Sequence, residues 1–183
     1  MWRRSRTKVA SNTPAAGNIH ETALRMLARR ALSRAEVAER LEGRGFGEPV
    51  VRAEIVRLER AGLLDDIVLA RAVCEAQVRA GRGRRAVAAA LKRRHLDKDA
   101  AEAALAELAE GDGEGAALAA AVERVTTKHR FWRRLPEERR KVVRYLLARG
   151  FGLDEVRRAL EEKRRDDPHG EQTDDAGDPQ GLS

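Results

Sequence analysis

An apolar pattern of five positions occurs three times along the chain with the same spacing, and it restricts the fold more than any other feature. The copies are Val37, Leu41, Phe46, Val51, Ile55; Val87, Leu91, Leu96, Ala101, Leu105; and Val142, Leu146, Phe151, Val156, Leu160. In each copy, two residues four apart precede a break and two residues four apart follow it. This spacing is typical of a helix, a tight turn and a second helix. A repeat with a period of roughly fifty residues predicts a helical array whose units cover one another's apolar faces.

The turns of the three copies read Arg44-Gly45-Phe46, Arg94-His95-Leu96 and Arg149-Gly150-Phe151. Glycine suits the left-handed backbone conformation that ends many helices, and the apolar residue after it packs back on the helix that it leaves. A residue with a Cβ atom adopts that conformation only at a cost. His95 therefore predicts either a different turn or local strain in the middle copy.

Composition favours helices throughout. Ala, Arg, Leu and Glu dominate, aromatic residues make up only 3% of the chain, and the β-branched and aromatic runs typical of strands are missing. Helix caps, such as the box formed by Ser33 and Glu36, and glycine breaks place the boundaries. We predict an all-α fold, an elongated array of three tandem three-helix repeats. The predicted ranges are 1–17 for a disordered basic arm, 18–62, 63–111 and 112–165 for the repeats, and 166–183 for a disordered acidic tail.

The formal net charge is +7, which favours an anionic partner such as nucleic acid, although Arg- and Ala-rich sequences also arise in GC-rich genomes. Basic residues cluster at one helix joint and on two helices. The candidates for contact with DNA or a protein partner are Arg79, Arg82, Arg84, Arg85, Lys92, Arg93, Arg94, Arg139, Arg140, Lys141 and Arg144. For each residue taken singly, a solvated helix face or a favourable position near a helix C-terminus is the simpler interpretation.

Two aromatic residues, Phe131 and Trp132, stand beside Arg133 and Arg134. Aromatic rings next to arginines are able to stack on the bases of single-stranded nucleic acid. In a chain with few aromatic residues, the same rings are also the natural filling for a thin core. We predict that both pack between the helices of the third repeat, with base stacking as the alternative.

The sequence contains no recognisable catalytic, cofactor-binding or metal-binding constellation. The histidines are scattered, and the single Cys74, predicted to be a small buried side chain, cannot form a structural zinc site. Helix capping explains Asp65 and Asp66 more simply than an acid pair or a metal site. We therefore expect no enzymatic activity and no cofactor. The lack of a long apolar run or a signal-peptide core predicts a cytoplasmic protein that does not bind membranes.

Several short motifs occur in an order that resembles the bacterial RecX family of regulators of the RecA recombinase. They are the run from Leu58 to Asp66 followed by Ala70, then Arg79 with Gly81, Leu91 with Arg93-Arg94, and Arg149-Gly150-Phe151 with Val156 and Leu160. The resemblance covers about residues 19–165. The sequence departs from the family pattern at His95, where glycine is usual, and in the acidic tail.

This resemblance implies a non-enzymatic regulator that binds the RecA filament on single-stranded DNA. It implies modulation, mainly inhibition, of the recombinase, ATPase and coprotease activities of RecA in DNA repair and the SOS response. The expected partners are the RecA filament and single-stranded DNA, with double-stranded DNA as a further option, and the expected state is a monomer. The alternative is a direct, helix-turn-helix-like DNA-binding protein. Against it, the second and third helices of each repeat lack an obvious recognition face of Asn, Gln and Arg.

Overall fold

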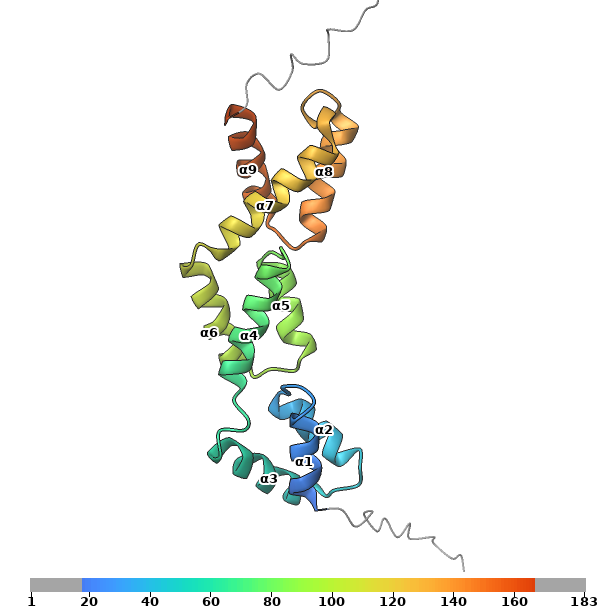
Figure 1. The fold of residues 1–183 in the computed structure, drawn as a ribbon, viewed down its shortest axis with the longest axis vertical. Helices are drawn as coiled ribbons and strands as arrows, with labels where there is room; N and C mark the ends of the chain where they lie inside the picture. Colours follow the sequence, from blue (N-terminus) through green and yellow to red (C-terminus); the bar gives the residue numbers. More distant parts are fainter. Residues whose placement is uncertain (1–17, 167–183) are drawn as a thin grey trace, which may run out of the picture. The chain divides into compact units, whose positions relative to one another are not determined.

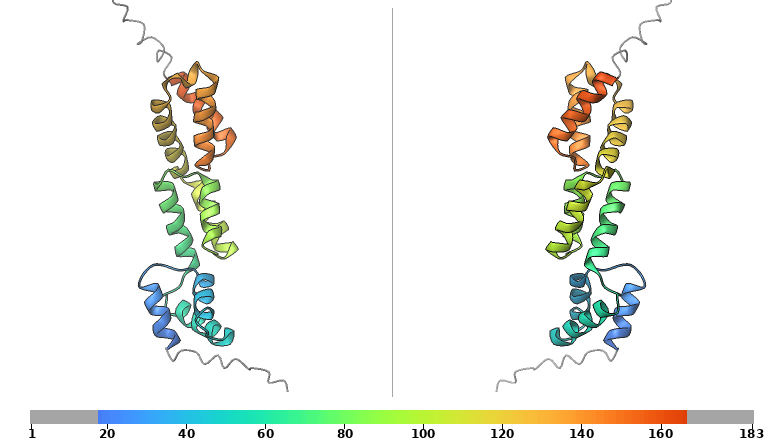
Figure 2. Two further views of the ribbon diagram at one scale, coloured as in Figure 1. Left: turned by 90° about the vertical axis from the view of Figure 1, so that its right-hand side faces the viewer. Right: turned by 90° about the vertical axis from the view of Figure 1, so that its left-hand side faces the viewer.

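The computed structural model describes residues 18–166, so the predicted basic arm and all of the predicted acidic tail except Asp166 lie outside the described residues. Within this range the chain forms nine α-helices and one short 3-10 helix, η1 (Figure 1). Their bounds are α1 (Ile19–Leu27), α2 (Arg34–Glu42), α3 (Glu48–Arg60), α4 (Asp66–Arg79), α5 (Arg84–Arg93), α6 (Lys98–Glu110), α7 (Gly113–Lys128), η1 (Arg130–Arg133), α8 (Pro136–Ala148) and α9 (Leu153–Asp166). Figure 2 shows only helices and turns over the described residues, which confirms the all-α prediction.

Two glycines near the predicted boundary between the second and third repeats are helical. Gly111, Gly113 and Gly115 interrupt the apolar pattern of the sequence and predict a break there, but Gly113 and Gly115 form the first turn of α7. The first backbone N–H groups of a helix lack intrahelical partners, so the first turn is held less tightly than the interior and a glycine there disturbs few bonds. Only Gly111 and Asp112 separate α6 from α7.

The chain divides into two compact units. Among the described residues, the first unit comprises those up to Ala72 together with Leu91–Ala103, and the second comprises Val73–Ala90 together with those from Ala104 onward. The division passes through α4, α5 and α6. The repeat boundaries expected from the sequence remain a prediction.

In the first unit, α1, α2 and α3 pack on one another around a small aliphatic core. The buried side chains are Ala23, Met26, Leu32, Val37, Leu41, Val51, Leu58 and Leu64. The capping box predicted at the start of α2 is confirmed, because Ser33 Oγ accepts the Glu36 N–H at 3.1 Å and the Glu36 carboxylate accepts the Ser33 N–H at 3.0 Å. This box fixes the point at which the connection from α1 becomes helical.

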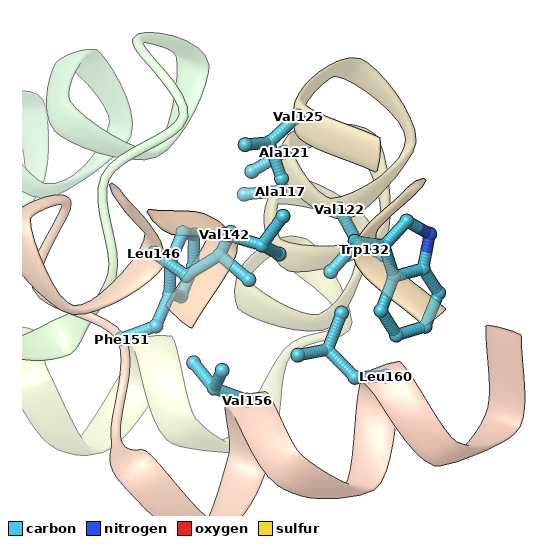
Figure 3. Close-up of a cluster of buried hydrophobic side chains, with 10 residues drawn as sticks. All are labelled: Ala117, Ala121, Val122, Val125, Trp132, Val142, Leu146, Phe151, Val156 and Leu160. Atoms are coloured by element: carbon cyan, nitrogen blue, oxygen red, sulfur yellow. The ribbon is translucent and has the colours of Figure 1, made fainter. Parts of the chain in front are cut away.

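In the second unit, side chains from α7, η1, α8 and α9 point toward one another (Figure 3). All five apolar positions of the third sequence copy are buried there: Val142, Leu146, Phe151, Val156 and Leu160. Trp132 is also buried in this core, as predicted, but the prediction for Phe131 is wrong because its side chain is 50% exposed. The tight 3-10 turn directs one of the two adjacent rings inward and the other outward.

The three repeated turns adopt one geometry. Gly45 and Gly150 have φ of 89° and 92°, which confirms the predicted left-handed conformation, and His95 adopts it as well with φ of 49°. In each turn, the N–H of the following apolar residue approaches the carbonyl oxygen five residues earlier, at 3.2 Å from Phe46 to Leu41 and 3.4 Å from Phe151 to Leu146. This is the Schellman arrangement. The middle turn therefore keeps its shape and forces His95 into an unfavourable region.

Candidate protein and nucleic-acid interface

The first group of candidate residues lies where α4 meets α5, in the second unit. Arg79, Arg82, Arg84 and Arg85 are all exposed. A further Schellman turn at Gly81, with φ of 68°, ends α4 between Arg79 and Arg82. Arg84 is partly anchored, because its guanidinium donates to the Leu105 carbonyl at 2.6 Å and its N–H donates to the Glu114 carboxylate at 2.5 Å.

The second group lies at the end of α5, in the first unit, and its members differ in environment. Lys92 and Arg93 are exposed, whereas Arg94 is half-buried. The Arg94 guanidinium donates to the Glu36 carboxylate at 3.0 Å and to the Ala31 carbonyl at 2.7 Å. Ser33 Oγ donates to the Arg94 carbonyl at 2.6 Å. Arg94 therefore joins the α5–α6 turn to the start of α2. We call this contact region the first junction. The guanidinium group of Arg94 is directed into the protein and not toward solvent.

Glu36 is the anion at the centre of the first junction. It is 7% exposed and also accepts a hydrogen bond from Arg30 at 2.9 Å. Burial alone would raise the pKa of this carboxyl, but the hydrogen bonds from Arg94, the Ser33 N–H and Arg30 outweigh burial and hold the pKa below its ordinary value of 4.5. The first junction therefore stabilises Glu36 in its ionised form.

A second junction with the same design occurs in the second unit. The Arg149 guanidinium donates to the Ala80 carbonyl at 2.9 Å. The N–H groups of Gly83 and Arg85 donate to the carbonyls of Arg149 and Gly150 at 3.0 and 3.1 Å. Sequence reasoning did not assign a role to Arg149. The available signal was its position directly before the left-handed residue, which Arg44 and Arg94 occupy in the other two copies.

The third group lies on α8. Arg139, Arg140, Lys141 and Arg144 are all exposed, and the Lys141 ammonium lies 2.6 Å from the Glu138 carboxylate. The three arginines line an open groove of about 820 Å³ between α8 and α9, which we call the basic groove. Its lining residues are Pro136, Arg139, Arg140, Val143, Arg144, Leu147, Ala148, Leu153, Arg157 and Leu160. Sequence reasoning missed Arg157, because only the packing of α9 on α8 brings it to the same groove.

The two adjacent aspartates at the start of α4 have different roles. Asp65 accepts hydrogen bonds from the N–H groups of Ile67 and Val68 at 2.8 and 3.0 Å, which confirms the predicted cap. Asp66 is buried and accepts N–H groups from Arg34 at 3.0 Å and Asp97 at 3.4 Å. Both aspartate carboxylates therefore accept hydrogen bonds from backbone N–H groups.

No cluster of three or more His, Cys, Asp or Glu side chains within residues 18–166 is arranged to hold a metal ion. None of the helices in the same range combines the length and apolar character needed to cross a bilayer. Cys74 is buried, as predicted, and burial raises the pKa of its thiol.

Comparison with known proteins identifies the family. The models of the first and third three-helix domains of RecX match residues 20–58 and 116–160. A protein of Halorhodospira halophila called regulatory protein RecX is 34% identical over 155 residues, which cover 83% of this chain and 92% of that protein. The chain belongs to the RecX family. This is a family of regulatory proteins, and its first and third three-helix domains match stretches that lie in the first and third repeats of the sequence.

Other RecX proteins are similar over shorter stretches or in fold alone. Regulatory protein RecX of Mycobacterium sp. strain KMS is 41% identical over 93 residues, or 50% of this chain, and the chain spans only about half of that relative, 51%. The crystal structure of RecX from Lactobacillus salivarius superposes with a TM-score of 0.69 at 20% identity, covering 79% of this chain and 93% of that chain. The fold is therefore that of RecX.

Proposed function

We propose that this RecX-family chain is a cytoplasmic, non-enzymatic regulator that binds the RecA filament on single-stranded DNA. In this proposal it mainly inhibits the recombinase, ATPase and coprotease activities of RecA in DNA repair and the SOS response. The observation that supports it most is membership of a family of regulatory proteins over most of the chain. Its partners would be RecA and the DNA that RecA coats.

The exposed cations suit such a partner. Apart from Arg94, every candidate residue named from the sequence is exposed. The planar guanidinium group binds carboxylates and phosphates through two parallel hydrogen bonds, so these arginines fit acidic protein surface and DNA backbone equally well. They are spread over α4, the α4–α5 connection, α5 and α8, and individually weak contacts from one chain add up through effective concentration.

One observation favours the alternative of direct binding to single-stranded DNA. Phe131 is half exposed at η1, and Arg130 beside it is exposed as well. An exposed ring flanked by a cation is a suitable platform for a nucleic-acid base, and such stacking is worth about 1–3 kcal/mol per base. Phe131→Ala tests this reading, since a stacked base would be lost without disturbing the core.

The deciding experiment measures the single-stranded-DNA-dependent ATPase rate of the cognate RecA while this protein is titrated below the concentration of DNA sites. We expect inhibition at substoichiometric amounts, because too little protein is then present to cover the DNA. The double variant Arg82→Glu/Arg85→Glu should weaken inhibition, whereas Arg124→Glu, an exposed charge reversal on α7, should not. Inhibition that appears only at saturation of the DNA would support direct competition for DNA instead.

A further inference from the structure

The basic groove combines exposed apolar side chains with cations. Its apolar lining residues include Val143, Leu147 and Leu153, which we call the floor, and the leucines at 147 and 153 are each 37% exposed. Its cationic lining residues, which we call the rim, are four arginines, Arg139, Arg140 and Arg144 from α8 and Arg157 from α9. An exposed apolar strip with a polar rim is typical of a binding groove.

The charge of the basic groove is of one sign. None of its lining residues is acidic. By contrast, a second groove, which involves α7 and other positions of α9, is lined by Glu114, Glu123, Glu155 and Glu162 as well as by cations. Helix α9 therefore contributes Arg157, which also forms an exposed ion pair with Asp154 at 3.7 Å, to a groove without acidic lining residues. The adjacent residue, Arg158, lines the mixed groove.

We propose that the basic groove binds an acidic amphipathic helix of a partner protein. The apolar face of that helix would cover Leu147 and Leu153, and carboxylates on its edges would pair with the four arginines. Helix-in-groove recognition uses this combination of apolar anchors and flanking charges. Burial of the exposed leucine surface supplies affinity, and the arginines supply orientation and specificity.

A protein helix fits this groove better than nucleic acid. A phosphate backbone would pair with the arginines but would gain nothing from the leucines, and no aromatic side chain lines the groove to stack on a base. The groove follows α8, whose 13 residues extend for roughly 20 Å at 1.5 Å per residue. An occupant of about three to four turns would therefore fill it. This inference concerns the groove itself and does not depend on RecA being the regulated enzyme.

The test uses a fluorescent synthetic helix of about 14 residues, with leucines at three- and four-residue spacing on one face and glutamates on both sides of them. Its binding to the full-length protein is followed by fluorescence anisotropy. The first control peptide has the same composition in scrambled order, and the second has lysine in place of every glutamate. We expect saturable binding of the acidic helix alone. Equal binding of the scrambled peptide would overturn the proposal.

Variants place the binding in the groove. Arg144→Glu/Arg157→Glu changes one arginine on each wall, and we expect at least a tenfold loss of affinity for the acidic helix. The matched control Arg124→Glu/Arg158→Glu makes the same charge change at exposed positions outside the groove and should leave the affinity within about twofold. Leu147→Asp tests the floor separately, also with a loss of about tenfold or more. Equal effects of the two double variants would overturn the proposal.

A competition experiment separates the two classes of partner. An oligothymidylate of single-stranded DNA is added to the preformed complex of the protein and the acidic helix. We expect the helix to remain bound, because the oligonucleotide has no apolar face for the leucine floor. Full displacement of the helix, together with loss of direct oligonucleotide binding in Arg144→Glu/Arg157→Glu but not in Arg124→Glu/Arg158→Glu, would mean that the groove is a nucleic-acid site and would overturn the proposal.

Discussion

At the scale of single residues, His95 carries strain that its counterparts avoid. It is held at φ of 49° in a turn where the other two copies have glycine, and this conformation costs a residue with a Cβ atom about 1–2 kcal/mol. His95→Gly should therefore raise the free energy of unfolding, by up to about 1 kcal/mol after the greater flexibility of unfolded glycine is subtracted. Urea unfolding measures the change.

A glycine-to-histidine substitution at another left-handed position, Gly62, is the control. Gly62 has φ of 68° and open space where a Cβ atom would lie, so Gly62→His introduces the same strain without a steric clash. It should lower the free energy of unfolding by a similar amount. If His95→Gly destabilises the protein instead, contacts of the imidazole outweigh the backbone strain.

Glu36 links stability to pH. Its pKa is lower in the folded protein than the ordinary value of 4.5, so the unfolded chain binds the proton more tightly. The stabilisation from the carboxylate is fully present above the unfolded pKa and is lost as pH falls through the folded pKa. Glu36→Gln should lower stability at pH 7 by about 2–3 kcal/mol and should flatten the loss of stability as pH falls below the ordinary carboxyl value of 4.5. Unfolding curves of Glu36→Gln and the unmodified protein, recorded over a series of acidic pH values, measure this. If stability falls with pH at the same slope in both proteins, the assignment to Glu36 is contradicted.

At the scale of elements, both units place a helix-ending turn against the start of another helix. In the first junction, Arg94 supplies the contact to Glu36 and Ala31. Arg94→Ala would leave a buried carboxylate short of its main donor, so we expect a loss of about 2–3 kcal/mol in the free energy of unfolding. Arg93→Ala, one residue earlier and exposed, should change it by less than about 0.5 kcal/mol. Similar losses in both variants would show that the junction contributes little.

The second junction depends on close backbone approach. A Cβ atom at Gly83 would lie 2.6 Å from both the ring and the backbone nitrogen of Phe151. Gly83→Ala should therefore destabilise the second unit by about 1–3 kcal/mol through steric overlap.

Gly115→Ala is the matched control, because it lies in α7 with no atom near the new Cβ; it should be neutral or stabilise by up to about 1 kcal/mol. Thermal unfolding of both variants provides the measurement. Equal stability of Gly83→Ala and the unmodified protein would mean that the backbone at Gly83 can move away from Phe151 without loss of free energy.

At the scale of the whole molecule, the net charge of +7 and the exposed leucines of the basic groove predict two kinds of salt dependence. Binding to bare single-stranded DNA should weaken steeply with salt, because each neutralised phosphate releases counterions. Binding to a RecA filament should retain a salt-tolerant part from apolar contacts, which are not screened. Affinities measured for both partners over the same salt series check this, and parallel slopes would favour simple DNA binding.

The sequence by itself determined the all-α fold, the caps at Ser33 and Asp65, and the left-handed turns at Gly45 and Gly150, whereas it left the turn at His95 open. These features depend on neighbours within about five residues, as with Asp65 and the N–H groups of Ile67 and Val68. The arginine-rich surface was also visible, because charged side chains remain solvated unless they are paired.

Only the tertiary structure decided which residues act over a distance. Asp66 meets the N–H of Arg34 across 32 positions, and Arg94 meets Glu36 across 58. The position of Arg94 directly before a left-handed residue sets it apart from Arg93 but does not name Glu36 as its partner, and nothing in the local pattern distinguishes Arg157 in the basic groove from Arg158 outside it. Local periodicity specifies the face of a helix, but the element that covers this face depends on how the chain packs.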